Sequence, residues 1–197
     1  MKTFSSKYNP SYPILTQTTT NDDLLWVIRA MGREQSREPL YGRFVVEDGY
    51  AVATDGRRLH KAKLKGNLLK DGLWGVVTVK ARSATIYQMD SEAELSFPNW
   101  KHIMRDNDEA NFLLSADLGG IYFEQGALAG ALSHVSKWPI YINPSFLEDL
   151  GERGVFRFYS AGQEWPLTGK DANGKNFVIM PLRGPEHSRI QLDGDNK

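Results

Sequence analysis

The sequence predicts an α+β fold made of two halves, each a helix followed by antiparallel strands, with an insertion between them. The first observation is a pair of Asp-Gly steps, at Asp48 and Asp55, that separate runs of β-branched and aromatic residues. Asp-Gly between apolar runs is typical of a tight turn, because glycine accepts the positive φ that such a turn needs. The second is the order of patterns, since a helix precedes strands at 20–64 and again at 143–182.

The composition is ordinary for a soluble globular protein. The 197 residues fit one large domain or one domain with an insertion. The 24 basic and 24 acidic side chains balance, so any contact with nucleic acid must come from a local patch. Cysteine is absent, which excludes disulfides, thiolate catalysis and zinc sites that need sulfur.

The expected location is the cytoplasm. No apolar run approaches the about 18 residues that a membrane-spanning helix requires, so no membrane association is expected. The segment Met1 to Ser6 lacks the apolar core of a secretory signal.

The first half begins with an extended lead-in at 1–19, in which Ile14-Leu15 is a candidate edge strand. A helix is expected to start after Thr20 or Asn21, because either side chain can cap it, and to continue to about Ser36 before Pro39. Its buried face follows the helical period and consists of Leu24, Val27, Ile28 and Met31.

Three arginines, Arg29, Arg33 and Arg37, form one stripe on the opposite side of this helix. Two interpretations stay open. The stripe is either a solvated face or a row of phosphate-facing guanidinium groups. Glu34 and Glu38 nearby dilute its positive charge.

A three-stranded meander is expected at Tyr41–Leu64, with its last corner at Thr54-Asp55-Gly56-Arg57. The final strand is basic, and lysines on an exposed edge strand also serve to prevent edge pairing. Strands are expected in the insertion at Leu73–Val79 and Thr85–Met89, and Phe97–Asn99 is expected to start a short amphipathic segment ending near Met104. Further candidate strands are Asn111–Leu114 and Ile121–Phe123, whereas Gln125–Val135 is open between helix and loop.

In the second half, Asn143 is expected to cap a short helix with Pro144 at its first position. Strands are expected at Ile140–Ile142, Val155–Tyr159, Trp165–Thr168 and Phe177–Leu182, with a turn at Asn173-Gly174. The predicted domain spans 20–183, divided into a first half at 20–65, an insertion at 66–138 and a second half at 139–183, and a flexible tail follows at 184–197.

The sequence contains no recognisable catalytic, cofactor or metal-binding motif. The histidines His60, His102, His134 and His187 are scattered without metal-ligand spacing. No nucleophile elbow, phosphate-binding loop or dinucleotide fingerprint occurs. We therefore expect no enzymatic activity, no cofactor and no bound metal.

Three segments, in this order, resemble the bacterial DNA polymerase III β subunit, the β sliding clamp. Val52-Ala-Thr-Asp-Gly-Arg-Arg-Leu59 is similar to the family's A-T-D-G-H-R-L corner, and Phe97-Pro-Asn-Trp-Lys-His-Ile-Met104 to its F-P-D-Y segment. Asn173 to Arg183, which contains Met-Pro-Leu-Arg, is similar to its closing V-M-P-x-R strand. Arg57 stands where the family usually has histidine, and Gly184 follows where the family has leucine and stops.

The resemblance implies a clamp fold with helices lining a ring and sheets outside, and a groove that takes short peptide motifs of a polymerase or clamp loader. Thr54, Gly56, Arg57, Arg58 and Leu59 match one wall of that groove. Met180, Pro181, Leu182 and Arg183 match the other, with Pro98 beside them. An apolar slot with a few backbone and basic groups suits a short peptide.

Two functions follow as hypotheses. The first is a non-enzymatic, sliding-clamp-like protein of bacterial or phage replication that binds partner peptides and, through Arg29, Arg33 and Arg37, double-stranded DNA without sequence preference, as a homo-oligomer. The alternative is a stand-alone protein-interaction module or decoy with a clamp fold and no DNA role, which the neutral charge and the acidic second helix favour.

Overall fold

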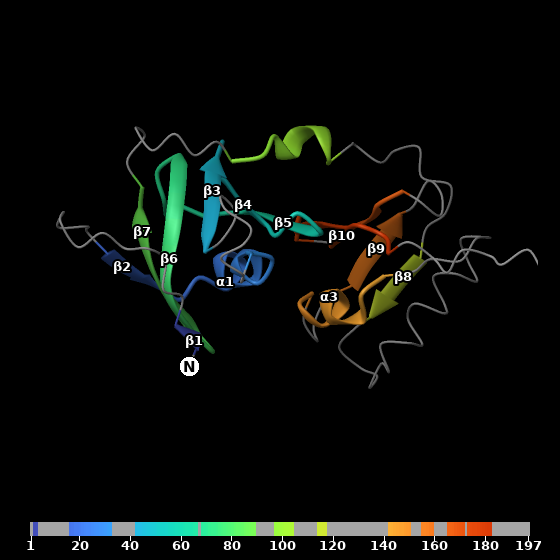
Figure 1. Ribbon diagram of the computed structural model, residues 1–197, viewed down its shortest axis with the longest axis horizontal. Helices are drawn as coiled ribbons and strands as arrows, with labels where there is room; N and C mark the ends of the chain where they lie inside the picture. Colours follow the sequence, from blue (N-terminus) through green and yellow to red (C-terminus); the bar gives the residue numbers. More distant parts are fainter. Residues whose placement is uncertain are drawn as a thin grey trace, which may run out of the picture.

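The computed structural model describes residues 2–3, 16–32, 42–66, 68–89, 97–104, 114–117, 142–150, 155–159, 165–171 and 173–182. Within them a single 11-stranded sheet has the order β2-β7-β6-β3-β4-β5-β11-β10-β9-β8, with β1 paired to β6 off this path. Helices α1 and α3 lie on one face of the sheet, here called the helix face (Figure 1). The short helix η2, lime in the figure, lies on the opposite or outer face. An α+β fold with antiparallel strands is therefore confirmed.

The elements have the following bounds. The strands are β1 (Lys2–Thr3), β2 (Thr16–Thr19), β3 (Arg43–Glu47), β4 (Tyr50–Thr54), β5 (Arg58–Lys63), β6 (Gly72–Lys80), β7 (Ser83–Gln88), β8 (Leu114–Asp117), β9 (Val155–Tyr159), β10 (Leu167–Asp171) and β11 (Asn176–Ile179). The helices are α1 (Asp22–Ile28), η2 (Trp100–His102) and α3 (Pro144–Glu148). None of the helices in these ranges has the length and apolar character that crossing a bilayer requires.

Helix α1 begins where its cap predicts and ends earlier than its spacing predicts. The backbone N–H of Leu24 donates to Oδ1 of Asn21 at 2.8 Å, which satisfies a free helix N-terminal donor. At the other end, the N–H groups of Arg29, Ala30 and Met31 each donate to the carbonyl three residues earlier. This tighter turn ends the helix at Ile28, so the prediction of helix through the following residues to Ser36 is wrong for the described residues 29–32.

The meander at Tyr41–Leu64 is confirmed as β3, β4 and β5, which pair in sequence order. Asp48 and Gly49 have φ of 53° and 74°, the left-handed conformation for which Asp-Gly is suited. Strands β6 and β7 continue the same sheet, because β6 pairs with β3 and β7 pairs with β2. Residues 72–88 of the predicted insertion thus extend the sheet of the first half, and the division into domains stays a prediction.

The second half also follows its local signals. The backbone N–H of Ser145 donates to Oδ1 of Asn143 at 3.1 Å, and Pro144 opens helix α3. Strands β9, β10 and β11 pair in sequence order, and Gly174 has a φ of +82° in the turn between the last two. The expected strand at Trp165–Thr168 begins later, at Leu167, and the one expected at Phe177–Leu182 ends earlier, at Ile179.

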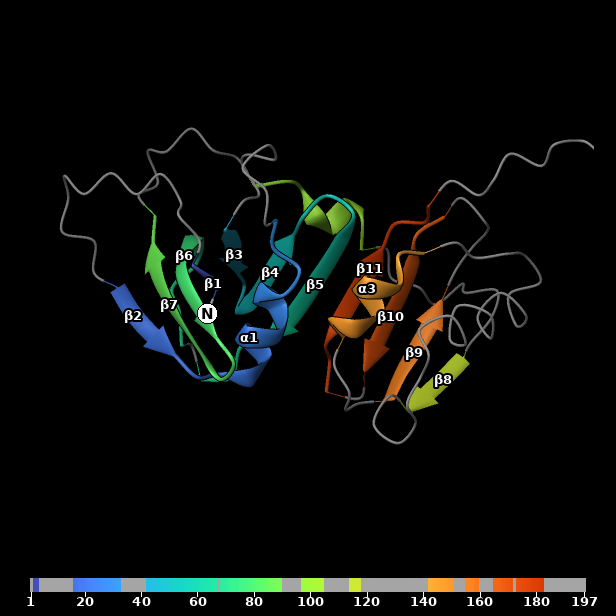
Figure 2. The ribbon, with the colours of Figure 1, turned by 60° about the horizontal axis from the view of Figure 1, so that its bottom comes forward.

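The two halves join through β5 and β11, which lie side by side in Figure 2. Their antiparallel register sets Arg58 opposite Ile179, Leu59 opposite Val178 and His60 opposite Phe177. Because side chains alternate along a strand, each of these strands serves both faces of the sheet. Phe177 and Ile179 belong to the cluster under the helices, and Val178 belongs to a separate cluster on the outer face.

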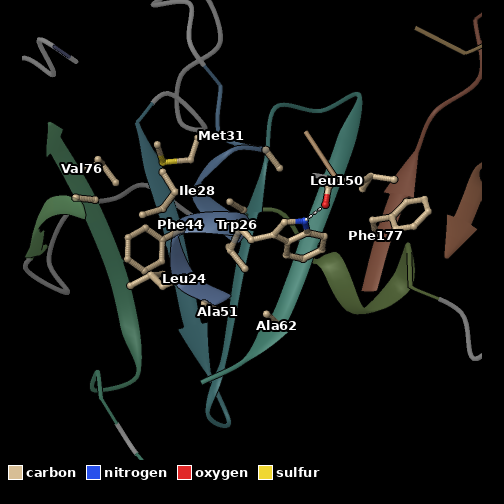
Figure 3. Close-up of a cluster of buried hydrophobic side chains, with 14 of the residues drawn as sticks. Leu24, Trp26, Ile28, Met31, Phe44, Ala51, Ala62, Val76, Leu150 and Phe177 are labelled. Carbon is tan, nitrogen blue, oxygen red and sulfur yellow. Dashed lines mark hydrogen bonds between the residues drawn. The ribbon is translucent and has the colours of Figure 1, made fainter. Parts of the chain in front are cut away.

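The larger cluster fills the space between the sheet and both helices. Figure 3 shows Trp26 of α1 at its centre, with the indole Nε1 donating to the carbonyl oxygen of Leu150 after α3 at 3.0 Å. Phe146, Leu147 and Leu150 are buried in it, as the sequence predicts for the second helix.

Several predictions lie outside the described residues. They concern Ile14, Leu15, Arg33, Arg37, Arg183, residues 111–113 and 121–141, and the tail at 184–197.

Candidate functional site

The corner between β4 and β5 is fixed by its own side chains. Oγ1 of Thr54 donates to the carbonyl oxygen of Arg58 at 2.6 Å and accepts the N–H of Gly56 at 3.0 Å. Oδ1 of Asp55 accepts the N–H groups of both Arg57 and Arg58 at 2.9 Å. Gly56 has a φ of +82°, which glycine adopts without the strain a larger residue would incur. The Thr-Asp-Gly sequence therefore determines the shape of this corner.

The corner meets the end of β11 directly. The backbone N–H of Met180 donates to the carbonyl oxygen of Arg57 at 2.7 Å, which extends the β5–β11 ladder by one bond. Two segments more than a hundred residues apart, each expected from the resemblance to form one wall of a groove, are thus neighbours at one end of the sheet junction.

On the outer face these segments share an apolar cluster. Val52, Leu59, Trp100 and Val178 are buried in it, and Val45, Phe97 and Met104 pack against it. Helix η2 covers the cluster with the indole ring of Trp100, which is 7% exposed. Since η2 is a single short turn, it covers only part of the face.

Exposed apolar side chains occur in the segments that form this cluster. Ile103 is 40% exposed, Met180 40% and Leu182 48%. The strand alternation that turns Val178 to the outer face also directs Met180 there. We call the set Leu59, Trp100, Ile103, Val178, Met180 and Leu182 the outer patch. Pro98 and Pro181 are half-buried beside it, in the segments that lead to η2 and away from β11.

Polar contacts fix η2 against the meander. Nε1 of Trp100 donates to Oε2 of Glu47 at 3.1 Å, and Nζ of Lys101 lies 2.6 Å from Oε1 of the same carboxylate. The hydrogen bond from Lys101 lowers the pKa of Glu47 and raises the pKa of Lys101. Nζ of Lys61 lies 4.4 Å from the ring centre of Tyr50 and 4.8 Å from that of Trp100. Trp100 is therefore held by Glu47 and by Lys61.

The two arginines of the corner face different environments. Arg57 is exposed at the junction. Arg58 is buried on the helix face, where Nε lies 3.2 Å from Oδ2 of Asp55 and Nη1 bonds to the carboxylate of Asp149 after α3. Its guanidinium carbon lies 4.7 Å from the ring centre of Phe146. Of the expected groove residues, Arg58 thus directs its side chain away from the outer patch.

His60 is buried on the helix face beneath α1. Its ring stacks on Trp26 with 4.2 Å between centroids, and Nδ1 lies 3.0 Å from the Trp26 carbonyl oxygen, so this nitrogen carries the proton. Nε2 has no hydrogen-bond partner among the described residues. Burial lowers the pKa of His60 to about 3, and the positive charges of Arg58, Arg29 and Lys175 act in the same direction.

The helix face shows one of the three arginines expected to face DNA. Arg29 is exposed at the end of α1, and its Nη1 donates to the carbonyl oxygen of Asp149 at 3.4 Å. Lys175 pairs with Asp23 at 3.3 Å. No cluster of three or more histidine, aspartate or glutamate side chains suited to a metal occurs in the ranges that the structure describes.

Trp100, Ile103 and Val178 are not among the site residues that the sequence predicts. A signal for them existed. The Phe97–Met104 segment is amphipathic, and Val178 is two residues before Met180, which places both on one side of a strand. What the sequence lacked was the pairing of β5 with β11, which makes this side the outer face of the junction.

No protein-family model matches the sequence, and no curated protein is significantly similar to it. Solved structures do match. A DNA polymerase sliding clamp from Pseudomonas aeruginosa matches with a TM-score of 0.52 and 16% identity, over 88% of this chain and 68% of the clamp chain. The sliding clamp from Caulobacter crescentus matches with a TM-score of 0.52 and 16% identity, over 89% of this chain and 69% of the clamp chain. The DNA polymerase III beta subunit from Thermotoga maritima matches with a TM-score of 0.50 and 12% identity, over 87% of this chain and 66% of the beta subunit. The chain therefore has a sliding-clamp-like fold, as its three motifs predict.

Proposed function

We propose that this chain is a non-enzymatic, sliding-clamp-like protein of bacterial or phage replication whose outer patch binds a short peptide of a partner such as a polymerase or a clamp loader. One observation carries the proposal. The hydrogen bond from Met180 to Arg57 joins the two motif segments beside a buried apolar cluster, next to the exposed side chains of Met180 and Leu182. A group of exposed apolar side chains on a protein surface often marks an interaction site.

The composition of the patch fits an extended peptide with apolar anchors. Met180 and Leu182 offer flexible or branched apolar surface, and Trp100 and Leu59 form its floor. The exposed guanidinium of Arg57 supplies a polar contact at the rim. Arg183, which follows directly in the sequence, belongs to the same proposed site.

Titration with a synthetic clamp-binding peptide tests this proposal. Leu182→Ala should weaken binding about tenfold, because buried anchor contacts dominate peptide affinity. Met180→Ala and Arg183→Ala should weaken it as well, whereas Leu59 is only 2% exposed, so that its truncation would act mainly on stability. Leu68→Ala is the matched control, since Leu68 is also a leucine about half exposed, at 52%, but lies in the β5–β6 connection away from the patch. Equal affinity in all five proteins would exclude the site.

The proposal includes double-stranded DNA as a second partner on the helix face, bound through Arg29, Arg33 and Arg37. Such binding is electrostatic and falls steeply with salt. Arg29→Gln should reduce the slope of log K against log salt by about 0.9, the value for one phosphate contact. Arg82→Gln is the control, because Arg82 is exposed in the β6–β7 turn. An unchanged slope in Arg29→Gln would remove this residue from the DNA site.

The second candidate is a stand-alone interaction module or decoy without a DNA role. The described charges of α1 favour it, because Asp22 and Asp23 in its first turn outnumber Arg29 at its end. Peptide binding without any salt-dependent DNA binding would establish this candidate over the first.

A homo-oligomer is part of the first candidate. Within the described residues the sheet is open, with β2 at one end and β8 at the other, and unpaired strand edges are places where further strands add. Size-exclusion chromatography with light scattering, with and without DNA, tests this. A monomer that DNA leaves unchanged would exclude an encircling ring.

A further inference from the structure

The C-terminal end of helix α3 is held by three groups of the first half. Arg58 pairs with the carboxylate of Asp149. Nη1 of Arg29 donates to the carbonyl oxygen of Asp149 at 3.4 Å, and Nε1 of Trp26 donates to that of Leu150 at 3.0 Å. The last carbonyls of a helix lack partners within it and carry its negative pole, so donors from another segment stabilise them. The helix end is therefore docked on α1 and β5.

Arg58 connects this docking to the outer face. Its Nε lies 3.2 Å from Oδ2 of Asp55, whose other oxygen accepts the N–H groups of Arg57 and Arg58. The carbonyl of Arg57 in turn accepts the N–H of Met180 at the rim of the outer patch. A continuous set of polar contacts thus leads from α3 on the helix face, through the corner, to the end of β11.

Because Arg58 is buried, these contacts depend on both of its carboxylate partners, Asp55 and Asp149. The side chain is 5% exposed, and the guanidinium lies between two carboxylates and the Phe146 ring. A buried charge is tolerated only when it is paired and hydrogen-bonded, so loss of one partner forces the guanidinium or the corner to move. Arginine suits the position because its planar fork serves two carboxylates at once, which a lysine ammonium does not.

We infer that Arg58, together with Asp55 and Asp149, is a positioning group for peptide binding: contacts on the helix face determine how the corner and the end of β11 are arranged on the outer face. The inference deepens the proposed function and rests on it. Asp149 lies after a helix on the opposite side of the sheet from the outer patch, so any effect of Asp149 on peptide affinity has to act through the sheet.

Two measurements test the inference on full-length protein. The first is peptide titration of Asp149→Asn, in which the shape is kept and the charge removed. We expect the dissociation constant to rise about fivefold, in the range found for residues that act through others. Asp149→Glu, which restores a carboxylate, should recover most of the affinity. Arg58→Lys combined with Asp149→Asn should lose no more than the worse single variant, because the two residues act together.

The second measurement is hydrogen exchange at the Met180 amide, which does not depend on peptide. Exchange there should become about fivefold faster in Asp149→Asn. Asp22→Asn is the matched control, because Asp22 is exposed on the same face at the first turn of α1, and it should change neither quantity.

The outcomes separate the two proposals. Unchanged exchange at Met180 in Asp149→Asn overturns the positioning role. Faster exchange in Asp149→Asn, combined with no peptide binding by the unaltered protein, supports the coupling between the two faces and rejects the peptide-binding function. Equal loss of affinity in Asp149→Asn and in Asp22→Asn also overturns the inference, since it points to the charge of the helix face in general.

Discussion

The two faces of the sheet are built from the same strands but covered very differently. On the helix face α1 and α3 bury the larger cluster, and the polar groups there, Arg58 and His60, are buried with it. On the outer face, among the elements that the structure describes, the short helix η2 covers a smaller cluster, and Ile103, Met180 and Leu182 are exposed. Neighbouring residues of one strand therefore lie in different environments, one on each face of the sheet. The helix face holds the molecule together, and the outer face keeps apolar surface in contact with solvent.

Phe177→Ala should produce the largest loss in the free energy of unfolding. Phe177 is fully buried on the helix face, where it packs in the cluster under the helices. Removal of a buried phenylalanine ring leaves a cavity and costs about 3 to 5 kcal/mol in the free energy of unfolding. Urea titration measures it. Leu182→Ala is the outer-face counterpart and should change that free energy by less than about 0.5 kcal/mol. Similar losses in both variants would contradict the distinction between the faces.

A fall in pH should lower the free energy of unfolding through His60, which is buried on the helix face. Its pKa is lowered from 6.5 to about 3 in the folded protein, mainly by burial, so the unfolded chain binds the proton first as the pH falls. Its contribution is therefore fully present above pH 6.5 and is lost progressively between pH 6.5 and about 3. At pH 5 the loss is about 2 kcal/mol.

Unfolding free energies at a series of pH values measure this effect. The profile of His60→Gln should be flatter than that of the unaltered protein in this range, because the substituted side chain does not titrate. His102→Gln is the control, since the His102 ring is exposed on η2. A profile that keeps its slope in His60→Gln would assign the pH dependence to other groups.

Gly75→Ala, on the outer face of the first half, should lower stability by less than Phe177→Ala does. Gly75 pairs with Tyr87 across β6 and β7, and a methyl group at this position would overlap the Tyr87 ring, which lies over the glycine. Displacement of this ring should cost about 1 to 2 kcal/mol. Thermal unfolding of Gly75→Ala measures the cost, and Tyr87→Leu in the same background should relieve part of it. An unaffected melting temperature would show that the ring moves freely.

Local chemistry made much of the fold predictable. The Asp48-Gly49 turn and the Asn21 and Asn143 caps depend on residues close in sequence, and each is confirmed. The pairing of β5 with β11 joins residues about 120 positions apart, and no local pattern encodes it. Without that register, the sequence could not show that the side chain of Arg58 lies on the helix face. The resemblance to sliding clamps assigned the two motifs to the two walls of a groove, but left open whether this chain brings them together.

The smallest expected change in stability belongs to the outer patch, where it is most informative. Ile103 is 40% exposed beside η2. Ile103→Asp should change the free energy of unfolding by no more than about 0.5 kcal/mol, because substitutions at exposed positions are usually tolerated. The same variant should weaken binding of the clamp-binding peptide by about tenfold or more, since a carboxylate placed in an apolar contact is desolvated without a partner. A stability loss of several kcal/mol would instead identify Ile103 as part of the core, and full peptide affinity would place the binding site elsewhere on the molecule.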